Sequence, residues 1–478
     1  MKRVVKNFSS YINGAWVQSE EIHSIYNPAN LKEHIQDICL ATSSDAKNAV
    51  LAARNASEIW SNTETLKRIS KLHRIMNDLE NQRNEVAEII TLENGKTILE
   101  ARGEVDAAIS EGNYQLEYLK NNLIEFEGSN KLLYRPLGVA LLITPWNFPL
   151  STVIRKMIPA LACGNTIVLK PSEYSSLTSL FIFEILDNNE LPKGSVNLVL
   201  GPGNTLSDAL INTDEVDIVS FTGSTATGES IQKKISHSNV RYQAEMGGAN
   251  ALVVWDDANI EMAVSATIAS GYACAGQWCT GISKLIIHES VYKNCIDILK
   301  KSVENIQVGN GLDQKTAMGP LCNKPQLNKM IDFVNRAADQ GAEILTGGSQ
   351  LFDKSKNGYF FQPTLLSNMS LDMEVSSEEI FGPIINVFKT NDINQAIKYA
   401  NLGKYGLSFS VYTSSESTAD RFISNVNASI CHVNMPTPYR EVSMPFTGWK
   451  LSGKGIPESG RFARDAFTKP KVVYRAAN

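Results

Sequence analysis

The run Val139-Ala-Leu-Leu-Ile-Thr-Pro-Trp-Asn-Phe-Pro149 decides the fold class, because it joins a short apolar segment to a stiff loop and a helical segment. Three further apolar runs follow, each separated from the next by a helical segment. This alternation is typical of a parallel, doubly wound sheet. Strands are expected at 139–144, 165–170, 195–200 and 217–221, and helices at 151–163, 177–188, 204–212 and 225–236.

The flanking segments extend this α/β pattern. A second alternating stretch, from Ala251 to about residue 435, predicts another α/β domain. Before the first sheet, residues 12–17 read as a turn between two short strands, and helices are predicted at 45–60, 65–92 and 99–121. Residues 469–474 predict a terminal strand that pairs with another segment.

Two of these predicted helices carry further expectations. In 65–92, Leu66, Ile69 and Leu72 begin a spacing of three and four residues that marks one buried face. The charged residues of 99–121 are expected to form a solvated face without chemistry.

Length and composition narrow the class of protein. A chain of 478 residues exceeds one hydrophobic core and predicts two or three domains. The net charge of −5, without a basic block, disfavours nucleic acid and membrane surfaces as partners. No secretory signal or run of ~20 apolar residues is visible, and the seven scattered cysteines suit reduced thiols. We therefore expect a cytoplasmic protein, and the cysteine spacing does not favour a metal site.

The predicted strand ends carry loops that suit a ligand. Asn147 offers an amide donor after the first strand, and Lys170-Pro-Ser-Glu173 ends the second. Gly201-Pro-Gly203 and Thr222-Gly-Ser-Thr225 lead into helices, whose N-termini bind phosphate groups. Each loop alone is more often an ordinary turn. Four in succession, at the edge where open α/β sheets bind ligands, favour a nucleotide site even without a G-x-G-x-x-G motif.

Two further segments carry candidate reactive groups. The stretch Ser270-Gly-Tyr-Ala-Cys-Ala-Gly-Gln-Trp-Cys-Thr-Gly281 places Cys279 among glycines, which permit the close approach of a ligand. A single cysteine is nevertheless more often a core residue than a nucleophile. Glu245, beside Gly247 and Gly248, is a candidate general base just before the second domain.

Taken together, the motifs resemble those of the NAD(P)-dependent aldehyde dehydrogenase superfamily, including its semialdehyde dehydrogenases. They occur in the family's order over nearly the whole chain. The matching segments are Pro145-Trp-Asn-Phe-Pro149, Lys170-Pro-Ser-Glu173, Phe221-Thr-Gly-Ser-Thr225, Glu245-Met-Gly-Gly248, Gly276-Gln-Trp-Cys279 and Glu379-Ile-Phe-Gly-Pro383.

The resemblance implies an α/β fold with two doubly wound parallel-sheet domains and a small oligomerisation hairpin and strand. The dinucleotide-binding domain would comprise residues 1–117 and 137–248, and the catalytic domain residues 249–440. Residues 118–136 and 441–478 would bridge subunits of a homodimer or homotetramer, with 466–478 supplying the strand.

The resemblance also implies a catalytic role for four residues. Cys279 would attack the aldehyde, while Asn147 and the backbone N–H of Cys279 hold the oxyanion. Glu245 would activate the water that hydrolyses the thioester, and Lys156, together with Glu458, would relay protons. One extra residue near Glu458 leaves that position open, because it is equally compatible with a surface role.

The cofactor implied is NAD, with NADP also possible. Its binding residues would be Trp146, Lys170, Glu173, Gly203, Gly223, Ser224, Glu379 and Phe381. Glu173 would accept bonds from the ribose hydroxyls and repel a 2′-phosphate, which favours NAD, whereas Lys170 partly offsets that repulsion.

Arg155 is the candidate substrate residue, because semialdehyde dehydrogenases carry Arg there to bind a distant carboxylate. A second arginine of the succinate semialdehyde group is Ala273 here, and Phe446-Thr-Gly448 departs from the usual Phe-Gly-Gly. The segments 432–437 and 448–450 are similar to α-ketoglutarate semialdehyde dehydrogenases. The leading prediction is a small acid semialdehyde.

Several alternatives to this substrate stay open. They are a neutral aldehyde, lactaldehyde, a coenzyme A-acylating reaction and a purely structural ion-pair role for Arg155. A non-enzymatic scaffold is disfavoured, because Cys279, Glu245 and Asn147 are all present.

Overall fold

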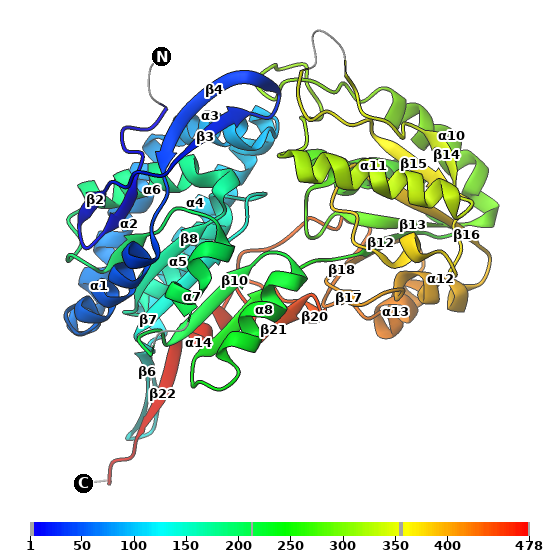
Figure 1. Cartoon of the computed structure of the whole chain (residues 1–478). Helices are drawn as coiled ribbons and strands as arrows, with labels where there is room; N and C mark the ends of the chain where they lie inside the picture. The colour runs from blue at the N-terminus through cyan, green and yellow to red at the C-terminus, as the bar shows by residue number, and fades with distance from the viewer. Residues whose placement is uncertain (1–3, 212–213, 353–356, 477–478) are drawn as a thin grey trace.

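The predicted alternation of strands and helices builds the first of two large sheets in the computed structural model, which describes residues 4–211, 214–352 and 357–476 (Figure 1). Its central strands run parallel, and antiparallel strands are added at both edges. In spatial order the strands are β2 (Ala15–Val17), β1 (Ser10–Ile12), β9 (Val196–Leu198), β8 (Thr166–Pro171), β7 (Val139–Thr144), β10 (Ile218–Thr222), β11 (Arg241–Glu245) and β21 (Gly453–Lys454).

Both faces of this sheet are buried, as the continuous apolar runs predicted. Along β7, Ala140 and Leu142 pack into one core, while Val139 and Leu141 pack into the other. The first core is formed with α2 (Thr65–Asn81), α3 (Arg83–Asn94), α4 (Ile98–Asn121), α5 (Ser151–Ala162) and α6 (Ser176–Asn188), and the second with α1 (Ser43–Asn62), α7 (Gly203–Ile211) and α8 (Thr225–Ile235).

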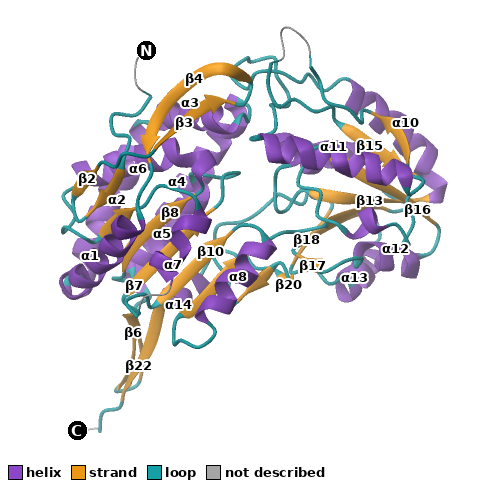
Figure 2. Cartoon of the chain, in the orientation of Figure 1, coloured by secondary structure: helices purple, strands orange, loops and turns teal. Residues whose placement is uncertain are grey.

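The second sheet forms the other lobe of the molecule and confirms the second α/β domain (Figure 2). Its strands, in spatial order, are β14 (Glu343–Thr346), β15 (Thr364–Ser367), β16 (Ile384–Thr390), β13 (Ile282–His288), β12 (Asn250–Val254), β18 (Ser408–Tyr412) and β19 (Ile430–Val433). Around it lie α9 (Ile260–Gly271), α10 (Glu289–Glu304), α11 (Lys324–Asp339), α12 (Ile393–Ala400) and α13 (Glu416–Asn425).

A small sheet projects from the first lobe next to the C-terminus (Figure 1). It consists of β5 (Ile124–Glu127), β6 (Asn130–Pro136) and β22 (Thr468–Val473), so the predicted terminal strand does pair with another segment. The helix α14 (Phe462–Phe467) lies directly before β22 in the chain. Separate pairs are β3 (Ile22–Asn27) with β4 (Asn30–Cys39), and β17 (Tyr405–Gly406) with β20 (Trp449–Lys450).

Two expectations about the N-terminal helices are wrong. The single helix expected at 65–92 is two helices, because the chain leaves helical geometry at Gln82. Leu66 is 54% exposed rather than part of the buried face. Ile69 and Leu72 are buried, as expected.

The expectation for the charged residues of α4 is partly wrong. Arg102, Asp106, Glu117 and Lys120 are exposed as expected, whereas two glutamates are not. Glu104 and Glu111 are 3% exposed and point into the protein, so this face of the helix is not solvated. Each meets a cation: Glu104 pairs with the buried Lys96, and Glu111 with the partly exposed Arg440. A paired cation makes the burial of a carboxylate tolerable.

The described parts of the chain contain no helix long and apolar enough to cross a membrane. Nor do they bring three His, Cys, Asp or Glu side chains together in a way that could hold a metal ion.

Asn165 links three elements and supplies a test of the fold. Its Oδ1 accepts from Gly138 N at 3.0 Å, and its Nδ2 donates to the carbonyls of Ala160 and Phe467 at 3.0 and 2.9 Å. We expect Asn165→Ala to lower the free energy of unfolding by ~2–4 kcal/mol, because buried backbone groups lose their partners. The exposed Asn305→Ala is the control, and equal unfolding midpoints in urea for the two variants would contradict this account.

Candidate active site

A cavity of about 580 Å³ lies between the two lobes, at the carboxyl ends of β7, β10 and β11. The register brings these ends level, because Phe221 of β10 pairs with Ile143 of β7, and Thr222 pairs with Glu245 of β11. Open α/β sheets place their ligands at this edge.

Most of the predicted site residues meet in this cavity. Those that line it are Cys279, Glu245, Asn147, Arg155, Trp146, Gly223, Ser224, Glu379 and Phe381. Lys156 lies behind Glu245, buried beneath the cavity wall. Lys170, Glu173 and Gly203 are not part of the lining and form a separate group, in which a Cβ on Gly203 would lie 3.7 Å from Lys170 Cε.

Cys279 follows a turn of three successive left-handed residues. The φ angles of Cys274, Ala275 and Gly276 are 52°, 54° and 67°, a conformation that non-glycine residues rarely adopt. At Gly276 a Cβ would come within 2.1 Å of the Gly382 carbonyl oxygen, so no larger residue fits. The turn thus depends on glycine and on its surroundings.

Cys279 lines the cavity and is partly exposed, in surroundings that disfavour the thiolate. Burial raises its pKa to about 12, and the nearby Arg155 guanidinium opposes this rise. The Cys279 carbonyl is fixed by Asn250 Nδ2 at 2.7 Å. Formation of the nucleophilic thiolate therefore requires a base close by.

Asn147 lies beside the thiol segment and is 6% exposed. Its Nδ2 donates to the Gln277 carbonyl at 3.0 Å. A side-chain amide has two N–H donors, so the second is left for a ligand oxygen. The arrangement can therefore stabilise negative charge on an oxygen that develops near Cys279.

Glu245 is the candidate base, at the end of β11. One of its carboxylate oxygens, Oε2, is buried without a hydrogen-bond partner. Burial, and next the charge of Glu458, raise the pKa of Glu245 well above its usual value, while Lys156 and Arg155 act in the opposite direction. A carboxyl group with a raised pKa is suited to exchange protons near neutral pH.

Lys156 joins Glu458 to two polar side chains under the cavity. Its Nζ is hydrogen-bonded to Glu458, to Ser220 Oγ at 2.9 Å and to Gln243 Oε1 at 3.3 Å. Glu458 is held by a two-way backbone pairing with Phe446 and is 5% exposed. The surface alternative for Glu458 is therefore wrong, and it contacts Lys156 as the resemblance implied.

Arg155 is a largely buried cation on the cavity wall. Its Nη1 lies 3.6 Å from Glu458 Oε2, and its guanidinium lies over the Phe446 ring, 5.0 Å from the centroid. Its Nε is buried without an acceptor. Arg155 is thus incompletely satisfied by the protein and is able to accept an anionic ligand.

The cavity wall near α8 fits a dinucleotide. Ser224 caps the N-terminus of α8, and the preceding Thr222 Oγ1 is buried without a partner. Opposite lies Glu379, whose Oε1 accepts from Gly248 N at 2.8 Å, and Trp146 meets Phe381 edge-on at 5.6 Å. These groups offer a helix N-terminus for phosphates, a carboxylate for hydroxyls and aromatic walls for a ring.

Lys170 is buried in the separate group at the end of β8. Burial lowers its pKa to about 8, and the charge of Glu173 opposes this shift. Its Nζ donates to the Pro171 carbonyl at 2.8 Å. This cation and carboxylate are suited to hydroxyl groups of a ribose.

Sequence reasoning missed the charged residues that contact the site from behind. Lys96 and Glu100 contact the loops of Asn147 and Cys279, and Arg440 lines the cavity beside Phe446. A usable signal existed for Glu100, because Thr97-Ile-Leu-Glu100 has the spacing of a capping box. Lys96 and Arg440 have no such signal, since Asn147 lies 51 residues from Lys96 and Glu111 lies 329 residues from Arg440.

Comparison with known proteins gives a consistent result. A profile of the aldehyde dehydrogenase family matches residues 16–473. The α-ketoglutaric semialdehyde dehydrogenase of Bacillus subtilis strain 168 is 34% identical over 476 residues, covering 98% of each chain.

Two solved structures superpose on nearly the whole chain. The betaine aldehyde dehydrogenase of Staphylococcus aureus in complex with NAD+ has a TM-score of 0.94 at 33% identity, covering 97% of this chain and 94% of the other. A 3,6-anhydro-L-galactose dehydrogenase in complex with NADP has a TM-score of 0.93 at 31% identity, covering 98% and 100%.

Proposed function

The chain belongs to the aldehyde dehydrogenase family, and we propose that its substrate is a small acid semialdehyde. It is an NAD(P)-dependent oxidoreductase that acts on the aldehyde group. The single observation that carries the substrate proposal is Arg155, a cavity-lining guanidinium whose buried Nε lacks an acceptor.

The reaction begins at Cys279. Its Sγ adds to the aldehyde carbon, the carbonyl electron pair moves onto oxygen, and the thiol proton passes to Glu245 directly or through a water. The free N–H of Asn147 Nδ2 and the backbone N–H of Cys279 stabilise the oxyanion. A base is needed at this step because the pKa of the Cys279 thiol is raised.

Bound NAD(P) supplies the acceptor for the hydride that leaves the thiohemiacetal carbon. Ser224 at the helix N-terminus would hold its phosphates, with Gly223 beside it, where a Cβ would lie 2.7 Å from the Phe221 ring. Lys170 and Glu173, with Gly203 beside them, would hold the adenosine ribose, and Glu379 the nicotinamide ribose. Trp146 and Phe381 would flank the ring.

Glu245 completes the reaction. Once the proton taken from the thiol has left through Lys156 and Glu458, the Glu245 carboxylate takes a second proton from water. The hydroxide formed adds to the thioester carbon, the C–S bond breaks, and Cys279 is released as a thiolate. Lys156 and Glu458 then carry the proton away from Glu245. The buried Oε2 of Glu245 supports this role, because it has no hydrogen-bond donor in the protein and can accept a hydrogen bond from a water.

Charge at the cavity supports an acidic aldehyde. Glu458 is shared by Lys156 and Arg155, and Arg440 is paired with Glu111. Three cations therefore face two carboxylates, while burial raises the pKa of the neighbouring Glu245 well above its usual value. A substrate carboxylate would balance the remaining positive charge.

Of the alternatives, a neutral substrate has its own support, whereas coenzyme A acylation is disfavoured. The ion pair of Arg155 with Glu458 fits a structural role and a neutral substrate such as lactaldehyde. A coenzyme A-acylating reaction needs no water-activating base, so Glu245 favours hydrolysis.

We also propose which segments bind the cofactor, which supply the thiol and which join the subunits. Residues 1–117 and 137–248 would bind the dinucleotide, and residues 249–440 would supply the thiol. The projecting strands within 118–136 and 441–478 would join copies of the chain into a homodimer or homotetramer. The exposed side chains of Phe126 and Val472 on this small sheet support that role.

Arg155→Leu tests the substrate class. We expect kcat/KM for succinate semialdehyde to fall about tenfold or more relative to propanal, because a charge-assisted hydrogen bond is lost. In the Arg155→Lys enzyme this ratio of kcat/KM values should fall less. The ratio is the measurement, since loss of Arg155 also affects Cys279 and Glu245 for every aldehyde, and an unchanged ratio would exclude an acidic substrate.

Cofactor choice is expected to favour NAD because of Glu173. A carboxylate at the ribose repels a 2′-phosphate, so kcat/KM should be higher with NAD than with NADP. Glu173→Gln removes the repulsion and should lower the ratio of kcat/KM with NAD to kcat/KM with NADP about tenfold. Equal values for the two cofactors in the unmodified enzyme would contradict the assignment.

Glu458→Gln tests the coupling to Glu245. Removal of one negative charge, with Lys156 and Arg155 retained, should lower the pKa of Glu245. The base acts when deprotonated, so the acidic limb of deacylation should move to lower pH by about one unit. Turnover of p-nitrophenyl acetate against pH measures it, with the exposed Glu416→Gln as control. A limb that stays in place or moves to higher pH would refute the coupling.

A further inference from the structure

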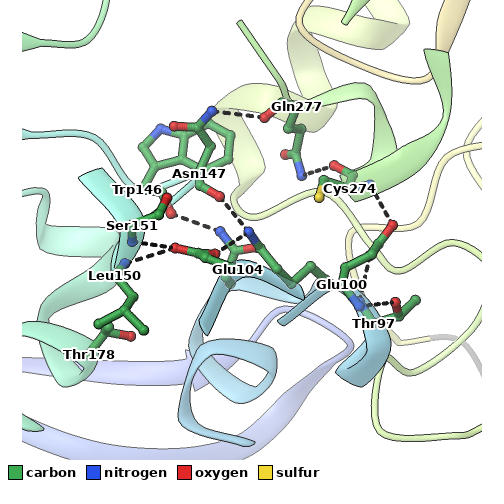
Figure 3. Close-up of polar contacts among 12 residues, drawn as sticks. Thr97, Glu100, Glu104, Trp146, Asn147, Leu150, Ser151, Thr178, Cys274 and Gln277 are labelled. Atoms are coloured by element: carbon green, nitrogen blue, oxygen red, sulfur yellow. Dashed lines mark hydrogen bonds and ion pairs between the residues drawn. The ribbon is translucent and has the colours of Figure 1, made fainter. Parts of the chain in front are cut away.

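The beginning of α4 contacts the two loops that carry the reactive groups of the site (Figure 3). We propose that Lys96 and Glu104 are positioning residues, which fix the oxyanion donor Asn147 relative to Cys279. The inference rests on the proposed function, in which Asn147 stabilises the oxyanion.

Lys96 holds the backbone of Asn147 itself. Its Nζ donates to the Asn147 carbonyl at 2.7 Å and to Glu104 Oε2 at 2.7 Å. The same ammonium lies over the Phe148 ring, 4.0 Å from the centroid. One cation thus restrains two successive residues of the oxyanion loop.

Glu104 holds the other end of that loop. Its Oε1 accepts from the backbone N–H groups of Leu150 and Ser151 at 2.8 and 3.1 Å, at the start of α5. A carboxylate at this place satisfies donors that have no partner within the helix. The loop from Asn147 to Ser151 is therefore tied to α4 at both ends.

The same turn of α4 is tied to the thiol loop by Glu100. Its Oε1 accepts from Cys274 N at 2.6 Å, and its Oε2 accepts from Thr97 N at 2.8 Å. Cys274 begins the left-handed turn that leads to Cys279. Because α4 is connected to both loops, a shift of the Asn147 loop relative to α4 also changes the position of Asn147 relative to the Cys279 thiol.

The energetics of the pair favour a positioning role over a stabilising one. The side chains of Lys96 and Glu104 are 1% and 0% exposed. Burial has the largest single effect and would lower the pKa of Lys96. The charge of Glu104, the smaller charge contributions of Cys274 and Glu100, and the hydrogen bond to Glu104 together exceed it, so the pKa is raised and the ammonium persists. A buried ion pair adds little net stability over a well-packed apolar pair, whereas its hydrogen bonds are directional.

A double-mutant cycle of Lys96→Met and Asn147→Ala tests the proposal. Both p-nitrophenyl acetate hydrolysis, which needs no cofactor, and propanal oxidation are measured. Asn147→Ala should lower kcat about 100-fold, and Lys96→Met about tenfold with KM nearly unchanged. The double variant should fall no more than about threefold below Asn147→Ala, because Lys96 acts through Asn147.

Loss of folding is separated from loss of positioning by a second variant. Lys96→Met leaves the Glu104 carboxylate buried and unpaired, which destabilises the protein. Lys96→Met/Glu104→Gln removes that charge and keeps an oxygen for Leu150 and Ser151. Its melting temperature should recover while kcat stays low. Arg102→Gln, on the exposed face of α4, is the control for both readouts.

Each contrary outcome has its own meaning. If Lys96→Met lowers kcat by the same factor with and without Asn147, the positioning role is wrong and the proposed function stands. If kcat of the doubly substituted Lys96→Met/Glu104→Gln enzyme recovers with its melting temperature, the pair is merely structural. A fully active Asn147→Ala enzyme would refute the oxyanion role of Asn147, and the positioning role with it.

Discussion

The parallel register of β7, β10 and β11 is the constraint on which the site depends. Because Thr222 pairs with Glu245 and Phe221 with Ile143, the three strands end at one level. Asn147 lies just beyond β7 and Glu245 at the end of β11, so both face the cavity into which the other lobe brings Cys279. Packing of both sheet faces in turn fixes that register, since a shift by one residue would exchange the two cores.

Burial then sets the chemistry. Removal from water raises the pKa of Cys279 to about 12 and raises the pKa of Glu245 well above its usual value. Each unit of such a shift corresponds to ~1.4 kcal/mol, so an uncompensated site would be inert. Two cations oppose these shifts. Arg155 lowers the pKa of both Cys279 and Glu245, and Lys156 lowers that of Glu245. The same cations are the basis of the proposal that the substrate carries a carboxylate.

The sequence predicts the parts of this arrangement that are written locally. Strand β7, the loop of Asn147 and the glycines around Cys279 follow from short-range patterns, and the order of the motifs indicates the family. Lys96, Glu104 and Arg440 could not be found in this way, because their charge resembles that of any solvated helix or loop. Only the fold brings Lys96 to Asn147, 51 residues away, or Arg440 to Glu111, 329 residues away. The break at Gln82 was missed for the related reason that helix propensity is continuous across it.

The central claim is that Cys279 carries the acyl group and that Glu245 releases it. Intact-mass measurement of a Glu245→Gln enzyme, mixed with NAD and an aldehyde, tests it most directly. The account predicts an adduct with the mass of the acyl group, accumulating at one equivalent and located on Cys279 by peptide mapping. An acyl group on Cys274, or an enzyme that turns over at the unmodified rate without accumulating an adduct, would contradict it.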